Sequence, residues 1–404
     1  MSSERPRVFV VRRLPSAIET KLCERYDAAL NATDETYPLA RLIEAARNFD
    51  AIVPTVVDDV PAEVFAADPL RARIIANYGV GFDRIDLEAA RAHNVVVTNT
   101  PGVLTEDTAD LAMMLILAAA RRTSEGERQL RAGDWAGWRP THLLGTRVNG
   151  ATLGIVGFGR IGAAVARRAY RGFGMRVLYV NPSTPDPTAV EEARAQRCAS
   201  LEELLAASDI VSLHAPAREG TRRMIDGRRL ESMRHGAILV NTARGDLIDE
   251  SALADALERG HLGAAALDVF EREPAVSDRL LVLPNMVLLP HLGSATTTSR
   301  VAMGERVLAN LDAFFRGLAP PDRRRHAVPA GVRFRHPHLA RRRDLHGRST
   351  CRRRRGAGGS GGGQGRPGRG PVVTNFMLVY SRSVLKGKEM MDHIKKADTV
   401  LKTI

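Results

Sequence analysis

Three charged side chains follow three separate apolar runs in the second half of the chain, and their types suit acid–base chemistry on a carbonyl group. Arg244 follows residues 237–241, Glu273 follows a run that ends near residue 270, and His291 follows residues 287–289. An arginine fork can hold the carboxylate and carbonyl oxygens of a planar 2-oxo acid together, and a histidine can donate a proton to the carbonyl oxygen. A carboxylate beside the histidine favours the imidazolium form. Taken singly, each residue also suits an ordinary structural role: a surface charge, a turn residue before Pro274 and a buried histidine.

A glycine-rich turn lies between a predicted strand and a predicted helix. The apolar run 153–156 leads into Gly157-x-Gly159-x-x-Gly162, and residues 161–170 have a helical pattern. In such turns the first glycine allows the tight bend, the second lets the backbone approach a pyrophosphate, and the third packs helix against strand. Asn181 stands 19 positions after Gly162, at the end of the predicted strand 176–180. This combination predicts a dinucleotide-binding site.

The elements that must position these residues alternate between strand and helix. In the first hundred residues the predicted strands are 8–11, 51–53, 73–76 and 95–98, and the helices between them are 16–26, 38–48 and 86–92. A long apolar helix is expected over 105–122. A second unit adds strands at 153–156, 176–180, 210–213, 237–241, 262–267 and 287–289, with helices at 161–170, 201–207 and 251–259. A last helix, 297–316, has the apolar spacing to pack back onto the body. The pattern predicts an α/β protein with parallel sheets.

The positive charge of the chain is concentrated in its last part. The formal net charge is +13, but residues 323–370 hold 15 arginines and a single acidic residue, whereas residues 1–322 hold 38 basic and 42 acidic side chains. The segment 356–371 is mostly glycine, so we expect residues 322–404 to form a low-complexity, disordered tail. Nucleic-acid binding is not expected except through this basic tail.

The cysteines and apolar runs exclude several other classes of protein. Cys23, Cys198 and Cys351 lie far apart, without the spacing of a metal or redox site, so no metal cofactor is expected. The longest apolar run, 111–120, is about half of what a membrane span requires. The N-terminus has no signal-peptide pattern. We therefore expect a cytoplasmic protein that does not bind membranes.

Over residues 7–321 the chain resembles the D-isomer-specific 2-hydroxyacid dehydrogenases. The matching motifs are GVGFDRID (79–86), VTNTPGVLTEDTADLA (97–112), GIVGFGRIG (154–162), HAP (214–216), NTARGDLID (241–249), DVFEREP (268–274) and PHLGS (290–294). The segment 97–112, together with Trp135 and Trp138, is most similar to the glyoxylate/hydroxypyruvate reductase branch. The resemblance implies two Rossmann-like, doubly wound parallel-sheet domains with a cleft between them: a substrate domain of residues 1–98 and 290–321, and a nucleotide domain of residues 99–289.

The resemblance also implies roles for individual residues. Arg244 would orient the substrate, His291 would be the acid–base residue, and Glu273 its partner. The backbone N–H groups of Val80 and Gly81 would hold the substrate carboxylate, and Trp138 would project toward the partner's site in a homodimer. The remaining residues would line the cofactor site: Thr108, Gly157, Gly159, Arg160, Ile161, Gly162, Asn181, Pro216, Thr221, Thr242, Ala243, Asp268 and Gly293.

The chain departs from the family pattern at two places. NAD-specific members carry an aspartate where this chain has Asn181, and no arginine follows until Arg194, so NAD and NADP both stay open, with Arg160 as the neighbouring cation. Family members end near residue 325, and the tail has no counterpart. The expected activity is reduction of glyoxylate or hydroxypyruvate by NAD(P)H to the D-2-hydroxy acid. The alternatives are another D-2-hydroxyacid or 3-phosphoglycerate dehydrogenase, or a non-catalytic, nicotinamide-sensing protein that resembles the dehydrogenase-like corepressors.

Overall fold

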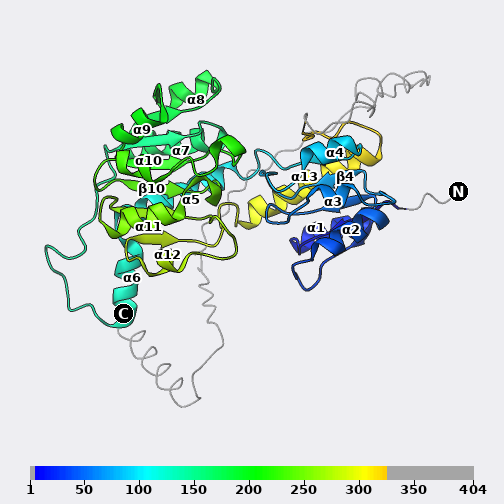
Figure 1. Ribbon diagram of the computed structural model, residues 1–404, viewed down its shortest axis with the longest axis horizontal. Coiled ribbons are helices and arrows are strands. Elements are labelled where there is room, and N and C mark those ends of the chain that lie inside the picture. Colours follow the sequence, from blue (N-terminus) through cyan, green and yellow to red (C-terminus); the bar gives the residue numbers. More distant parts are fainter. Residues whose placement is uncertain (1–4, 325–404) are drawn as a thin grey trace, which may run out of the picture. The chain divides into compact units, whose positions relative to one another are not determined.

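The computed structural model describes residues 5–324, which form two parallel β-sheets with helices packed against them (Figure 1). The first sheet has the strand order β2-β1-β3-β4-β5. Its strands are β1 (Arg7–Val10), β2 (Asp27–Ala29), β3 (Ala51–Val53), β4 (Ile74–Ala76) and β5 (Val96–Thr98). Short β2 follows α1 without a clear apolar run, so the sequence pattern did not predict it.

The second sheet has the strand order β12-β11-β10-β9-β6-β7-β8. Its strands are β6 (Thr152–Val156), β7 (Arg176–Val180), β8 (Gln196–Arg197), β9 (Ile210–Leu213), β10 (Ile238–Asn241), β11 (Ala264–Leu267) and β12 (Met286–Leu288). All residues of β9, β10 and β11 are buried, as expected of parallel strands covered on both faces. The direction of the strand order reverses beside β6: β7 and β8 lie on one side of it, and the chain then crosses to β9 on the other side. Open sheets of this kind bind ligands at such a switch point, beyond the carboxyl ends of the strands.

The helices that pack on the first sheet come from both ends of the described chain. They are α1 (Ser16–Arg25), α2 (Leu39–Asn48), α3 (Ala62–Phe65), α4 (Leu87–Ala92) and α13 (Thr297–Phe315). Met303, Val307 and Leu308 of α13 are buried in one cluster with Ile18 and Leu22 of α1. In Figure 1, α13 is yellow and lies among the blue elements of the first sheet. The predicted packing of this helix back onto the body is therefore confirmed, and its partner there is α1.

The second sheet carries the remaining helices. They are α5 (Thr105–Ala120), α6 (Thr123–Ala132), α7 (Arg160–Phe173), α8 (Pro187–Glu192), α9 (Leu201–Ala207), α10 (Gly227–Ser232), α11 (Glu250–Glu258) and α12 (Asp278–Val282), with short 3-10 turns η1 (Glu219–Thr221) and η2 (Gly245–Leu247). Apolar α5 is buried against α7, β10 and β11. The helix expected over 105–122 ends two residues early, because Arg122 adopts a left-handed backbone (φ 52°) from which α6 begins.

Two further expectations concern membrane-spanning helices and the C-terminal tail. In residues 5–324 no helix is long and apolar enough to cross a membrane. The predicted tail, residues 322–404, lies outside the described residues except for Asp322, Arg323 and Arg324. Arg323 pairs with Thr98 as an antiparallel bridge at the edge of the first sheet, so the described chain ends beside β5.

Candidate active site

The glycine-rich turn lies at the carboxyl end of β6, where the sequence placed it. Gly157 has a left-handed backbone with φ 95°, which a side chain would strain. A Cβ on Gly162 would lie 2.2 Å from the carbonyl oxygen of Gly157, so the helix can approach the strand only without a side chain there. No atom lies within 4 Å of the corresponding position at Gly159, the N-cap of α7. The turn therefore leaves open space in front of the free N–H groups of a 14-residue helix, which attract an anion.

A cavity of about 880 Å³ extends from this helix start to the loops of the first sheet. Twelve of the predicted site residues line it: Val80, Gly81, Thr108, Arg160, Ile161, Pro216, Thr242, Ala243, Arg244, Asp268, His291 and Gly293. Glu273 lines a smaller, neighbouring opening of about 580 Å³, whose wall also includes Arg244 and His291. The predicted residues Gly157, Gly159, Gly162, Asn181, Thr221 and Trp138 do not line the large cavity.

His291 and Glu273 form a direct pair. The imidazole Nδ1 donates to Oε2 of Glu273 at 2.9 Å, and the other carboxylate oxygen accepts from the backbone N–H of Phe270 at 3.0 Å. Burial alone would raise the pKa of Glu273, but the hydrogen bond from His291, its charge, the Phe270 N–H and the charge of Arg244 together hold this pKa below its ordinary value. Glu273 is therefore an anion at neutral pH, and it orients the ring so that Nε2 is free to act.

The backbone at His291 is held in an unusual conformation. Its φ of 56° is left-handed, which costs free energy for a residue with a side chain. The buried Asp268 compensates: its carbonyl accepts from His291 N at 2.9 Å, and its carboxylate accepts from Leu292 N at 2.6 Å and from Gly293 N at 2.8 Å. Burial raises the pKa of Asp268, and these backbone hydrogen bonds oppose the rise. Asp268 thus fixes the loop that presents the histidine.

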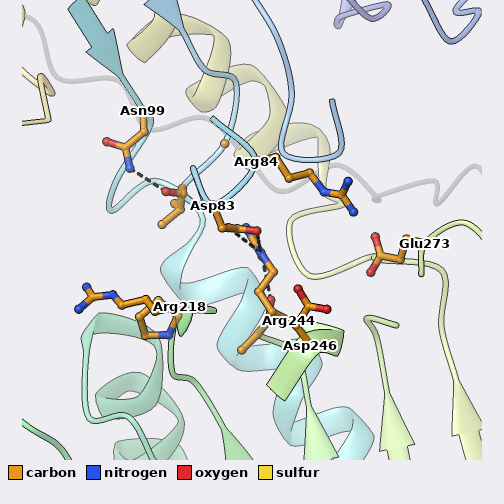
Figure 2. A network of polar contacts seen from close by, with 12 residues as sticks. Asp83, Arg84, Asn99, Arg218, Arg244, Asp246 and Glu273 are labelled. Carbon is orange, nitrogen blue, oxygen red and sulfur yellow. Dashed lines mark hydrogen bonds and ion pairs between the residues drawn. The ribbon is translucent and has the colours of Figure 1, made fainter. Parts of the chain in front are cut away.

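Arg244 crosses to the loop that follows β4. Its Nε donates to Oδ1 of Asp83 at 3.0 Å, and its Nη1 donates to the carbonyl of Ala243 at 2.8 Å (Figure 2). A Cβ on Gly81 would lie 1.4 Å from Nη2, so the guanidinium rests directly against this glycine. The sequence pattern did not reveal this dependence, because Gly81 and Arg244 are 163 positions apart.

The loop that carries Val80 and Gly81 is held through its carbonyl groups. Asn99 donates to the carbonyl of Val80 at 2.7 Å (Figure 2), and Asn77 donates to that of Gly81 at 2.6 Å. Within residues 5–324, the backbone N–H groups of Val80 and Gly81 take part in no intramolecular hydrogen bond. These N–H groups, beside the guanidinium of Arg244, are therefore available to an anionic ligand.

Two of the predicted cofactor-binding residues, Thr221 and Thr108, form hydrogen bonds to backbone carbonyl groups of the protein. The hydroxyl of Thr221 donates to Pro216 O at 2.8 Å and so shapes the loop after β9. Thr108 donates to Gly293 O at 2.8 Å, which ties α5 to the His291 loop. Thr242 differs, because its buried hydroxyl has no partner in the described part of the chain, and it lines the cavity.

Asn181 supports the glycine-rich turn. Its side-chain oxygen accepts from Phe158 N at 3.0 Å, and its amide nitrogen donates to Ser183. We expected Arg160 as the neighbouring cation, but in the structure Arg197, on the adjacent edge strand β8, donates to the carbonyl of Asn181 at 3.1 Å. Strand pairing brings this residue close, since Tyr179 and Arg197 are register partners. The separation of 16 positions between Asn181 and Arg197 hid this contact from the local sequence pattern.

His214 lies at the cavity, whereas Trp138 does not. His214 lines the cavity, and its Nε2 lies 2.9 Å from the hydroxyl oxygen of Ser212. Burial lowers the pKa of His214 to about 4, so this histidine is neutral at physiological pH. The HAP motif was noted in the sequence, but no role was predicted for its histidine. Trp138 is 82% exposed and lies away from the cavity wall of its own chain.

The comparisons with known proteins show the family of the chain. Residues 113–293 match the family described as D-isomer specific 2-hydroxyacid dehydrogenase, NAD binding domain. A glyoxylate reductase of Korarchaeum cryptofilum is 48% identical over 79% of this chain and 95% of its own. The NADPH-dependent glyoxylate/hydroxypyruvate reductase of Sinorhizobium meliloti, solved with NADP and malonate, is 33% identical over 80% of this chain and 98% of its own, with a TM-score of 0.72. The holo D-mandelate dehydrogenase of Rhodotorula graminis is 30% identical over the same shares, also with a TM-score of 0.72. The chain belongs to the D-isomer-specific 2-hydroxyacid dehydrogenase family.

Proposed function

We propose that this protein reduces a small 2-oxo acid, glyoxylate or hydroxypyruvate, to the D-2-hydroxy acid with a nicotinamide dinucleotide. The observation that carries the proposal is that Arg244, Glu273 and His291, far apart in sequence, line one opening beside the large cavity. The names of the glyoxylate reductases that resemble this chain support the choice of substrate. We further propose that residues 1–98 and 290–321 form the substrate domain and residues 99–289 the nucleotide domain.

The residues of the second sheet fit a nicotinamide dinucleotide. The open start of α7 suits the diphosphate, and the unpartnered hydroxyl of Thr242 points to a polar ligand in the cavity. The cavity volume lies within the range of pockets that take cofactor-sized ligands. In this assignment Arg160, Ile161, Pro216, Ala243 and Gly293 line the cofactor, whereas Gly157, Gly162, Asn181 and Thr221 shape the loops that face it.

The bound reduced nicotinamide supplies the hydride. In the reaction that we propose, the N–H groups of Val80 and Gly81 and the guanidinium of Arg244 bind the substrate carboxylate and carbonyl oxygen. His291 donates the proton from Nε2 to the carbonyl oxygen as it becomes a hydroxyl. Glu273 accepts from Nδ1 and stabilises the imidazolium form that donates. Arg244 can keep its contact with Asp83 as it does this, because Nε makes that contact and Nη2 donates to no group within residues 5–324.

We propose that the protein uses both NADH and NADPH. Asn181 brings no negative charge to the end of β7, and Arg197 places a cation there that can bind a 2′-phosphate.

The predicted dimer is also a proposal. Exposed apolar side chains gather between residues 114 and 144: Met114, Leu130, Trp135, Trp138 and Leu144. Such a concentration is typical of a contact surface, and a second copy of the chain would cover it.

The proposed function is tested by steady-state kinetics. Purified full-length protein is assayed with glyoxylate, hydroxypyruvate, 3-phosphohydroxypyruvate and larger 2-oxo acids, each with NADH and NADPH. We expect the highest kcat/KM for glyoxylate or hydroxypyruvate. A nucleotide-sensing binding protein would bind both cofactors and turn over none of these acids, and that result would overturn the proposal. A preference for 3-phosphohydroxypyruvate would move the protein to the phosphoglycerate branch.

A further inference from the structure

The wall of the large cavity carries far more positive than negative side chains. Seven arginines and three aspartates line it: Arg12, Arg13, Arg160, Arg218, Arg244, Arg300 and Arg324, and Asp34, Asp83 and Asp268. Two of the arginines are neutralised, because Arg12 pairs with Asp58 at 2.9 Å and Arg244 with Asp83 at 3.0 Å. Asp268 is used by backbone N–H groups. The cavity therefore keeps an excess of cationic groups, which favours an anionic ligand.

Three of these arginines line the cavity from separate segments of the chain. Arg160 is the first residue of α7, Arg218 follows β9, and Arg324 is the last described residue. All three side chains line the same cavity, and burial together with the charges of Arg160 and Arg218 lowers the pKa of Arg324. None of them has an ion-pair partner within residues 5–324. Like charges gathered in this way repel, and a bound anion relieves that repulsion.

Arg324 is fixed on the side of the first sheet. Its N–H donates to the carbonyl of Val97 at 2.9 Å, next to the bridge between Thr98 and Arg323. Its guanidinium carbon lies 4.0 Å from the centre of the Phe82 ring, a stacking that holds the side chain over the loop that carries Val80 and Gly81. Arg160 and Arg218, by contrast, stand on elements of the second sheet. The cluster therefore spans the two sheets.

We propose that Arg324 is a phosphate-binding residue, which joins Arg160 and Arg218 around the diphosphate of the bound dinucleotide from the opposite side of the cleft. The diphosphate is the expected ligand because Arg160 opens the helix whose free N–H groups face the same space. The inference rests on the proposed use of a nicotinamide dinucleotide. It adds a residue beyond 7–321, the region over which the sequence resembles the family, and it gives cofactor binding a direct contact with the first sheet.

The test measures binding without turnover. Dissociation constants of NADPH and of ADP-ribose are measured by calorimetry for the full-length wild type, for Arg324→Gln and for Arg324→Lys. Arg316→Gln is the matched control, since this exposed arginine lies at the end of α13 near Tyr26 and does not line the cavity. We expect Arg324→Gln to weaken both ligands about tenfold, the effect of losing a hydrogen bond to a charged group. Arg324→Lys should keep most of the affinity, and Arg316→Gln should match the wild type. The affinity of Arg324→Gln should also fall less steeply with added salt.

The possible failures are distinguishable. If the wild type bound neither NADPH nor ADP-ribose, the proposed function itself would fail. If Arg324→Gln bound both ligands as the wild type does, only the role of Arg324 would be overturned. If its dissociation constants were unchanged but its KM for the 2-oxo acid rose, Arg324 would bind the substrate instead of the cofactor. Thermal unfolding of each variant checks that the fold is retained.

Discussion

Replacement of Gly81 by alanine should damage the site mainly through Arg244. The added Cβ would lie 1.4 Å from Nη2 of Arg244 and 2.6 Å from its Cζ, whereas ordinary contacts begin near 3.4 Å. The guanidinium must therefore retreat by about 2 Å, and a displacement of about 1 Å from reacting geometry already costs about 100-fold in rate. The backbone of Gly81 is not left-handed, so the alanine itself adds no conformational strain. We expect kcat/KM to fall at least about 100-fold, or about 2.7 kcal/mol of transition-state stabilisation.

The assay compares catalysis with cofactor binding and includes a matched glycine. Gly81→Ala should leave the dissociation constant of NADPH unchanged, because Gly81 belongs to the loop of the first sheet. Gly220→Ala is the control, since no atom lies within 4 Å of its Cβ position and its φ is not positive. In a double-mutant cycle, Gly81→Ala should add almost nothing to the loss caused by Arg244→Ala. Fully additive losses, or wild-type activity in Gly81→Ala, would refute the reasoning.

Three further predictions follow from the same geometry. His291→Asn should remove most turnover and leave the affinity for NADPH within twofold of wild type, as measured by kinetics and by fluorescence titration; unchanged turnover would contradict the role of the histidine. Folding lowers the pKa of Glu273, so its stabilising contribution is complete above the ordinary value of 4.5 and is lost as the pH falls through the lowered value. The difference in unfolding free energy between wild type and Glu273→Gln should thus shrink as the pH falls below 4.5 in urea titrations; a difference that grew below pH 4.5 would show the opposite shift. Arg197→Gln should raise the dissociation constant of NADPH about tenfold and leave that of NADH unchanged. The control is Arg176→Gln, which should alter neither dissociation constant; the side chain of Arg176 donates to Gln196, the neighbour of Arg197 on β8.

The sequence was sufficient for those features that local patterns determine. Continuous apolar runs such as 210–213 and 176–180 matched β9 and β7 residue for residue, because strands buried on both faces leave little choice of side chain. The glycine-rich turn was equally readable, since Gly157 needs its positive φ and Gly162 its close approach. Helix ends were harder to predict. Arg122, with its left-handed backbone, separates α5 from α6, and no glycine or proline marks this break in the sequence.

Contacts between distant segments could not be predicted from local patterns. The sequence suggested Arg244 as a substrate-binding residue, but neither its pairing with Asp83 nor its contact with Gly81 follows from spacing. Arg197 reaches Asn181 only because β8 pairs beside β7. The left-handed backbone of His291 is likewise a tertiary effect, sustained by Asp268 from the end of β11.

The central claim is that Arg244 and His291 direct a hydride and a proton to the same carbonyl group. The most direct measurement is a single turnover of hydroxypyruvate with NADPH that carries deuterium on the transferred position of the ring. We expect glycerate that carries the deuterium at C2 and has the D configuration, with His291→Asn yielding almost none. Glycerate without the label, product of the L configuration, or no product from the wild type in the presence of tightly bound NADPH would contradict the account.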